Sequence, residues 1–295
     1  QNVNGETFLS FLGKNSFESE KQAYEQFGFS YIIPEMRNGL GEFENTPTPE
    51  NIISWEKIRG VVHNHSTYSD GKHTLTEMAE ACRRLGWEYF GIADHSQTAA
   101  YARGLWPETV QKQHREIDEL NAGFNNGFRI LKGIESDILP DGSLDYDTEV
   151  LKTFDYIVAS VHSVLSMDIE KATFRLIRAI ENPYTSILGH PTGRLLLRRT
   201  GYPIDYRKVI DACAANGVVM ELNANPYRLD IDWTWIPYCL ERGVMISINP
   251  DAHSTEGLLD TKYGVMIARK AGLPANMTLN ALPLTEVLKK LKKGS

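Results

Sequence analysis

The stretch Val61-Val62-His63-Asn64-His65-Ser66-Thr67-Tyr68-Ser69-Asp70-Gly71 turns from apolar to polar within a few residues. Its two valines end an apolar run and predict a buried strand. His63 and His65 are two residues apart, so on a strand their side chains leave the same face. Two adjacent imidazoles can hold one metal ion, and Asp70 follows in a turn that Gly71 closes. Taken alone, the pattern is equally consistent with two surface histidines.

From residue 60 onward, short apolar strands alternate with amphipathic helices. Strands are predicted at Gly60–His63, Tyr89–Ala93, Arg129–Ile134, Tyr156–Val161, Ser186–Leu188, Val218–Leu222 and Val244–Ile248. Helices are predicted at Thr74–Leu85, Pro107–Ala122, Asp168–Glu181, Asp205–Ala215, Trp233–Arg242, Thr261–Ala271 and Leu284–Lys292. Thr74 and Glu77 have the spacing of a capping box, and Gly86 and Gly243 lie where helices should end.

This alternation predicts an α/β fold with a parallel sheet. Seven strand–helix units within about 240 residues suit a closed barrel of the TIM type. We therefore expect a distorted seven-stranded (β/α)7 TIM-like barrel with a short N-terminal extension. An open, doubly wound sheet is the alternative.

Residues 1–50 differ from the rest of the chain. A helix is predicted at Ser16–Phe27, followed by Tyr31–Arg37 and a Gly/Glu-rich stretch. A segment this short cannot bury a core of its own. We interpret residues 1–50 as the tail of a preceding domain plus a linker, and residues 51–295 as the main domain.

Composition limits the possible functions. The chain has 295 residues, 42% of them hydrophobic, and a net charge of −7, which gives no general attraction to phosphates. No apolar run reaches the length of about 20 residues that a membrane span needs, so no membrane partner is expected. The three cysteines form no Cys-X-X-Cys pair and are predicted to be reduced core residues, which favours a cytoplasmic protein. The sequence indicates no obligate protein partner.

Metal-binding residue types recur where the predicted strands end. Because the carboxyl ends of parallel barrel strands meet on one face, these residues should lie together. The candidate ligands are His63, His65, Asp70, His95, Glu135, His162, His190, Asp251 and His253. Nine nitrogen and oxygen donors without a thiolate suit two or three ions of zinc, manganese or iron. His73 fits a surface turn better than a ligand, and His114 is predicted to be solvated.

Polar residues after two further strands are candidates for substrate binding. Arg194, Arg198 and Arg199 follow His190 and could clamp a phosphate, with Arg194 nearest the metals. A solvated basic loop is the equal alternative. Asn223 and Asn225 close the sixth predicted strand and could orient substrate or support the ligands from behind.

Taken in order, these motifs resemble the PHP (polymerase and histidinol phosphatase) domain across residues 58 to 280. The motifs are His63-Asn64-His65, Ser69-Asp70-Gly71, Asp94-His95, Glu135, Ser160-Val161-His162, Gly189-His190-Pro191 and Asp251-Ala252-His253. Three stretches are similar to the PHP domain of bacterial family X DNA polymerases: Gly189–Leu196, Asn223–Pro226 and Ile248–His253. The stretch Tyr31–Arg37 is similar to the end of the polymerase part of those proteins.

The resemblance implies a site for three divalent ions, Zn²⁺ or Mn²⁺ or both, with iron also fitting. By the family pattern, His63, His65, Glu135 and Asp251 surround the first ion. Glu135 bridges to a second ion that His162 and His190 hold. Asp70, His95 and His253 hold the third. Glu135 and Arg194 are the expected catalytic residues.

The resulting prediction is a metal-dependent phosphoesterase that hydrolyses phosphodiester bonds of nucleic acid, with DNA ends or another phosphoester as its substrate. The family suggests a 3′–5′ exonuclease, with 3′-phosphatase or abasic-site cleavage as further activities, in the C-terminal part of a family X DNA polymerase. One alternative is a small-molecule phosphomonoesterase of the histidinol-phosphatase type. The other is a metal-binding structural or docking domain without turnover.

Overall fold

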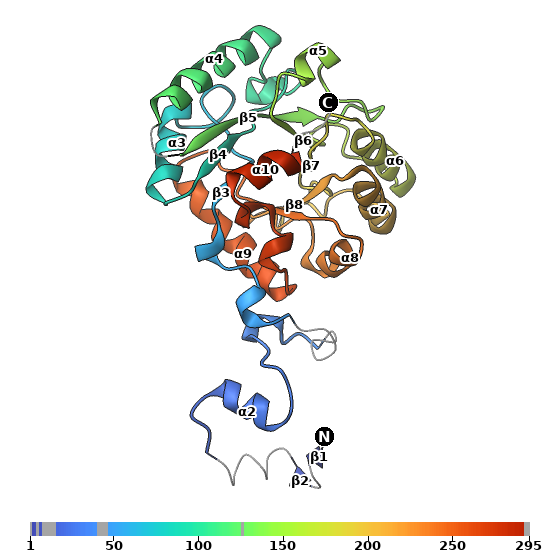
Figure 1. The fold of residues 1–295 in the computed structure, drawn as a ribbon. Coiled ribbons are helices and arrows are strands. Elements are labelled where there is room, and N and C mark those ends of the chain that lie inside the picture. Colours follow the sequence, from blue (N-terminus) through green and yellow to red (C-terminus); the bar gives the residue numbers. More distant parts are fainter. Residues whose placement is uncertain (1, 4–5, 8–15, 40–46, 125–126, 292–295) are drawn as a thin grey trace.

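The computed structural model describes residues 2–3, 6–7, 16–39, 47–124 and 127–291. Seven parallel strands follow one another around a nearly closed barrel, with helices on its outside (Figure 1). The strands are β3 (Gly60–Val61), β4 (Tyr89–Ile92), β5 (Arg129–Asp137), β6 (Tyr156–Ser160), β7 (Ile187–Leu188), β8 (Val219–Asn223) and β9 (Ile246–Asn249). The predicted (β/α)7 barrel is confirmed.

The helices are interleaved with the strands as predicted, apart from the short helix at Thr148–Leu151, which was not predicted. They are α3 (Leu75–Arg84), α4 (Pro107–Gly123), α5 (Thr148–Leu151), α6 (Ile169–Ile180), α7 (Tyr206–Asn216), α8 (Ile236–Glu241), α9 (Thr261–Lys270) and α10 (Leu284–Leu291). Thr74 and Glu77 form the predicted capping box at the start of α3. The predicted helix at Trp233–Arg242 is split into a 3₁₀ turn at Trp233–Trp235 and α8. Lys292, the predicted end of the last helix, lies outside the described residues.

The first and last strands meet through backbone and side-chain contacts, which excludes the open sheet. Asn64 forms a parallel bridge with Ala252, and the His65 N–H donates to the Ala252 carbonyl at 2.8 Å. Asn280 joins the same seam, since its amide donates to the Gly60 carbonyl and its oxygen accepts from the Ile248 N–H. These bonds bring the loops after β3 and β9 together.

Apolar side chains fill the barrel interior below the strand ends. Tyr89 and Tyr156 are the bulkiest among them, and the Tyr156 hydroxyl donates to the Ile92 carbonyl at 2.7 Å. Gly91 and Gly133 make room for it, because a Cβ on either would lie within 2.4 Å of the Tyr156 side chain. Helix α10 covers the opposite end, where Val287 and Leu291 join the interior cluster (Figure 1).

The N-terminal segment includes α2 (Glu20–Gln26) and two short antiparallel strands, β1 (Asn2–Val3) and β2 (Glu6–Thr7). Helix α2 is shorter than the predicted Ser16–Phe27, and Figure 1 shows it apart from the barrel. Ile32, Ile33 and Met36 are buried in the same core as the barrel helices. The predicted domain boundary at residue 50 stays a prediction.

Candidate metal centre

The nine predicted donors lie together at the carboxyl ends of the strands. Six of them are buried, while His162, Asp70 and His253 are partly exposed. Asp251 follows β9 with a φ of 53°, in the left-handed region that non-glycine residues rarely adopt. Such backbone strain persists only where the surrounding structure holds it, and it is frequent at functional sites.

Glu135 stands at the middle of the cluster, at the end of β5. Its Oε1 lies 3.3 Å from His63 Nε2, 3.1 Å from His162 Nε2 and 2.9 Å from His190 Nε2. Its Oε2 lies 3.1 Å from His95 Nδ1 and 3.7 Å from His65 Nε2. One carboxylate therefore contacts five imidazoles from four different strand ends.

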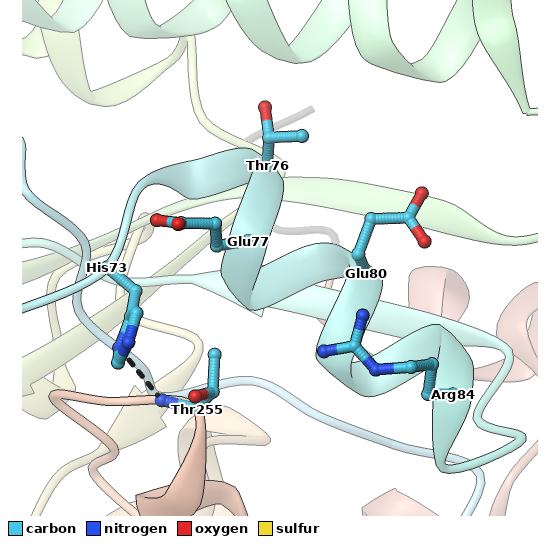
Figure 2. A pocket seen from close by; sticks show the side chains of 6 residues that line it. All are labelled: His73, Thr76, Glu77, Glu80, Arg84 and Thr255. Carbon is cyan, nitrogen blue, oxygen red and sulfur yellow. Dashed lines mark hydrogen bonds between the residues drawn. The ribbon is translucent and has the colours of Figure 1, made fainter.

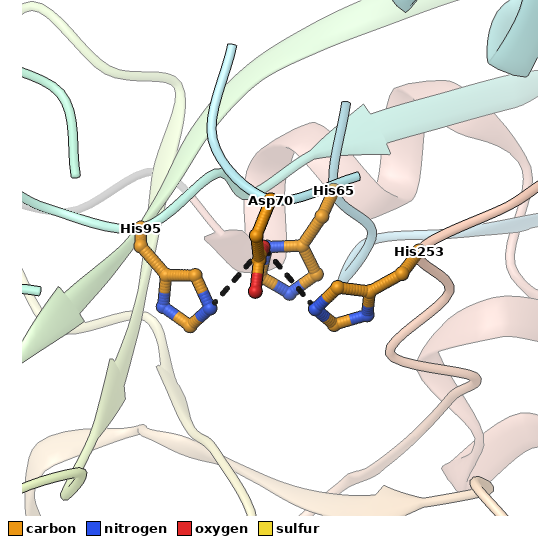
Figure 3. Close-up of side chains that lie close together, drawn as sticks. All are labelled: His65, Asp70, His95 and His253. Carbon is orange, nitrogen blue, oxygen red and sulfur yellow. Dashed lines mark ion pairs between the residues drawn. The ribbon is translucent and has the colours of Figure 1, made fainter. Parts of the chain in front are cut away.

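Among the described residues, the donors fall into four overlapping groups whose ligand atoms lie within 4.8 Å of one another. The groups are His65–Asp70–His95–His253, His63–His65–Asp251, His63–Glu135–His190 and His95–Glu135–His162. The first is shown in Figure 3, where Asp70 points between His95 and His253 at 3.7 and 3.3 Å. His162 and His190 reach the same Glu135 oxygen but fall in different groups, unlike the family pattern.

Buried ring nitrogens test whether a metal fits these groups. His63 Nε2 and His95 Nδ1 are buried and have no hydrogen-bond partner within the described residues, although both face Glu135. A buried nitrogen without a partner is costly unless something else binds it. The donors are all nitrogen or oxygen, and the three free cysteines are buried. The clusters therefore fit divalent metal ions.

The charges of the cluster favour ionised carboxylates. Burial opposes ionisation of Glu135, but His162, His63 and His95 outweigh it and hold its pKa well below the usual value. Burial, with smaller contributions from His65 and His162, lowers the pKa of His95 to about 3, so this imidazole is neutral. Burial acts the same way on His162, yet Glu135 and Asp137 raise its pKa to about 10. A metal at His162 must therefore displace a proton.

Carboxylates behind the ligands orient them, and sequence reasoning missed their role. Glu221 on β8 lies 2.7 Å from His63 Nδ1 and accepts from the His190 N–H at 2.7 Å. Asp137 contacts His162 Nδ1 in the same way. Such partners fix the ring orientation of metal-binding histidines. A carboxylate inside the apolar run Val219–Leu222 is the sequence signal that could have revealed Glu221, because a buried charge needs a partner.

Asp94 anchors the loop that carries His63 and His65. It is fully buried and accepts hydrogen bonds from the backbone and hydroxyl groups of Ser66 and Ser69 and from Gln113. Burial raises the pKa of Asp94, while these donors act to lower it. The loop after β3 is thus tied to the end of β4.

The arginine beside the cluster is Arg228, which the sequence analysis did not single out. Its Nε lies 3.4 Å from Asp251 Oδ2, and its side chain is largely buried. Arg194 instead pairs with Asp232 at 2.8 Å and donates to the carbonyls of Arg228 and Leu229. The expectation that Arg194 lies nearest the metals is not supported by these contacts, because Arg194 organises the loop that carries Arg228.

The remaining predicted substrate residues occupy different settings. Asn223 is fully buried and donates to Asp251 at 3.1 Å, which fits support of a ligand from behind rather than contact with substrate. The Asn225 side chain accepts from the Tyr227 N–H in a turn. Arg198 and Arg199 are exposed, and Arg199 donates to the Gly193 carbonyl.

The two histidines predicted to lie outside the site do so, but one differs in detail. His73 accepts from the Thr255 N–H at 3.2 Å and lines a surface groove with Thr76, Glu77, Glu80 and Arg84 (Figure 2). The prediction that His114 is solvated is wrong. His114 packs edge-on against Phe154, and burial lowers its pKa to about 4. The helical pattern of α4 alone did not reveal that His114 contacts Phe154.

The sequence profile of the PHP domain matches residues 62–225, which span the loops from His63 to Asn225. The chain belongs to the PHP domain family. This confirms the family prediction, and the PHP fold explains why ligands from six strand ends converge.

The curated relatives of this chain carry two kinds of name. The chain is 44% identical over 279 residues to the DNA polymerase/3′-5′ exonuclease PolX of Bacillus subtilis (strain 168), covering 95% of the chain and 49% of that protein. The chain thus spans about half of that relative's length. It is 30% identical to a probable phosphatase of Thermoanaerobacter sp. (strain X514), over 74% of the chain and 88% of the relative.

A solved structure has the same fold. The histidinol phosphate phosphatase of Lactococcus lactis, complexed with zinc, L-histidinol and phosphate, superposes with a TM-score of 0.57 at 17% identity. The match covers 72% of this chain and 94% of that one. These relatives agree with the predicted enzyme class.

Within the described residues, no helix has the length and apolar character that crossing a membrane requires.

Proposed function

We propose that this PHP domain is a metal-dependent phosphoesterase that acts on DNA ends as a 3′–5′ exonuclease and forms the C-terminal part of a family X DNA polymerase. The observation that carries the proposal is the complete donor set, because nine residues with nitrogen or oxygen donors, Glu135 among them, gather at the same strand ends. The similarity to PolX along 95% of the chain supports DNA as the substrate. Activity as a 3′-phosphatase or on abasic sites would use the same centre.

We further propose three divalent ions, Zn²⁺ or Mn²⁺ or both, with iron as a further fit. His63, His65, Glu135 and Asp251 would hold one, His162 and His190 with Glu135 the second, and Asp70, His95 and His253 the third. Three groups go beyond this division, since His65 also joins the Asp70 group, His95 joins Glu135 and His162, and His63 joins Glu135 and His190.

When bound, divalent ions activate water at neutral pH and neutralise the charge of a phosphate. The chain's own residues prepare the site for this chemistry. Glu135 presents one oxygen to His162 and the other to His95, so both oxygens would be available to hold bound metal. Arg228, beside Asp251, is placed to donate to a phosphate oxygen at the cluster. Asn223 and Glu221 hold Asp251 and His63 in orientation from behind.

A specific experiment tests the reaction class. Purified, manganese-supplemented protein is assayed on end-labelled single-stranded DNA, on DNA with recessed ends, and on p-nitrophenyl phosphate. We expect stepwise shortening from the 3′ end that a chelator abolishes. Shortening from the 5′ end, or no cleavage of DNA with full metal content, would contradict the exonuclease proposal.

The phosphatase relatives and the histidinol phosphate phosphatase fold favour one second candidate, a small-molecule phosphomonoesterase. In that case the protein hydrolyses phosphomonoesters efficiently and is indifferent to added DNA. Competition distinguishes the two, because a DNA enzyme with one centre should lose p-nitrophenyl phosphate turnover when an oligonucleotide occupies the site.

A further inference from the structure

Tyr101 stands at the mouth of the metal centre with much of its ring open. The ring centroid lies 5.8 Å from that of His95 and 6.4 Å from that of His162, and both contacts are edge-on. Yet 68% of the residue is exposed to solvent. An aromatic ring that touches two metal-centre histidines while most of its surface stays open can offer that surface to a substrate.

The backbone presents Tyr101 from a well-packed loop. Tyr101 lies in a 3₁₀ turn between Ala99 and Ala102, both of which are fully buried. Gly104 is pressed against the loop after β4, because a Cβ there would lie 1.8 Å from the Ser96 carbonyl oxygen. Arg103 adopts a left-handed φ of 57°. Strain of this kind persists only where packing enforces it, so the exposure of Tyr101 is built into the loop.

The chemistry around the ring suits a nucleotide. A tyrosine side chain carries no charge at ordinary pH, so it does not repel a phosphate. Every nucleobase has a π face that stacks on an exposed aromatic ring, independent of sequence.

We propose that Tyr101 is a specificity-determining residue whose ring stacks on the base of the terminal nucleotide while the adjoining phosphate occupies the metal centre. This inference rests on the proposed function on DNA ends. The ring, rather than the hydroxyl, makes the contact, so Tyr101→Phe should behave like the wild type and Tyr101→Ala should not.

The test removes the base and the ring separately. Metal-loaded wild type, Tyr101→Ala and Tyr101→Phe are assayed for kcat and KM on an oligonucleotide with a normal 3′ end and on the same strand whose last residue lacks its base. For wild type and Tyr101→Phe we expect the missing base to raise KM about tenfold, the range of one base–aromatic stack. For Tyr101→Ala the two strands should have equal KM.

Two further measurements separate stacking from other roles. Affinity for a strand with a non-hydrolysable last linkage, measured by fluorescence anisotropy, should show the same pattern as KM. Tyr263→Ala removes an exposed tyrosine from α9 and should leave the base dependence intact. Hydrolysis of β-glycerophosphate, which has no ring to stack, should be the same in all variants.

The outcomes distinguish this inference from the proposed function. If wild type cleaves both strands with equal KM, or if Tyr101→Ala retains the base dependence, stacking is overturned while the exonuclease stands. If Tyr101→Ala loses bound metal, the ring merely shields His95 and His162, and the inference is overturned. If metal-loaded wild type cleaves neither strand, the proposed function fails and the inference fails with it.

Discussion

At the scale of single residues, Glu135 determines how the centre works. Its two oxygens contact five imidazoles, and a neutral amide offers only one acceptor oxygen. Glu135→Gln should lower kcat by more than about 100-fold, beyond the usual cost of losing a supporting group. Steady-state kinetics on a phosphoester measures this. Glu119→Gln, the same change at an exposed site on α4, is the matched control. Near-normal rates in Glu135→Gln would contradict a bridging role.

Glu221 acts through the residues it orients. It holds His63 through Nδ1 and His190 through its backbone N–H, and Asn249 also donates to it. Glu221→Gln should weaken metal affinity about 10- to 100-fold, as for other residues that orient ligands. Calorimetric metal titration measures the affinity. Excess metal should restore much of the activity. It would not restore activity after the loss of a residue that touches the substrate.

At the scale of elements, the loop after β8 carries Arg228, and hydrogen bonds from Arg194 hold that loop in place. Arg228→Ala should lower kcat/KM on every phosphoester about 10- to 100-fold at normal thermal stability, because it removes one charged donor beside Asp251. Arg194→Ala should instead lower the melting temperature, since it frees the carbonyls of Arg228 and Leu229 and leaves Asp232 without its partner. Kinetics and thermal unfolding of the two variants measure the difference. The reverse pattern would restore Arg194 as the catalytic arginine.

The loop after β7 exposes Arg198 and Arg199 beyond the centre. If they contact the DNA backbone, replacing both with Ala should reduce the salt dependence of binding by up to about two units of slope. Hydrolysis of p-nitrophenyl phosphate should be unchanged, because a small ester needs no contact so far from the metals. Filter binding across a salt series measures the slope. Equal losses on both substrates would favour the small-molecule phosphatase, and no loss on either would mean a solvated loop.

At the scale of the whole molecule, the stability gained from bound metal should depend on pH, because metal ions and protons compete for the same histidine nitrogens. Without metal, Glu135 and Asp137 raise the pKa of His162 to about 10, and Asp70 and Asp251 raise that of His253 to about 9, against the opposing effect of burial. Raised pKa values stabilise the metal-free fold below about pH 6.5, and this stabilisation is lost as pH rises through 9 to 10. Metal ions need the same nitrogens deprotonated, so the gain in melting temperature on metal loading should be larger at pH 8 than at pH 6.

Scanning fluorimetry of loaded and chelated protein at both pH values measures this gain. Elemental analysis of the loaded protein should find close to three ions per chain, and activity should fall below about pH 6. One ion or none in protein never exposed to chelator would contradict the three-ion proposal. A gain that is larger at pH 6 would contradict the competition between protons and metal.

The sequence by itself determined the barrel and which residues gather at its mouth. Alternating apolar strands and amphipathic helices allow few architectures, and the strand ends of a parallel barrel must meet. His63, Glu135 and Asp251 could therefore be placed together by their positions alone. The resemblance to PHP domains supplied a ligand pattern that the order of the motifs supports.

Only the tertiary structure decided which groups touch within that mouth. Arg194 and Arg228 are both polar loop residues in sequence, but in the structure Arg194 pairs with Asp232 and Arg228 lies beside Asp251. In the sequence Glu221 is a single charge within a strand, and only the structure shows that it lies against His63. The solvated surface predicted for His114 failed because Phe154, forty residues away, covers it. Side-chain contacts between distant segments depend on shape and packing, which periodicity along the chain does not encode.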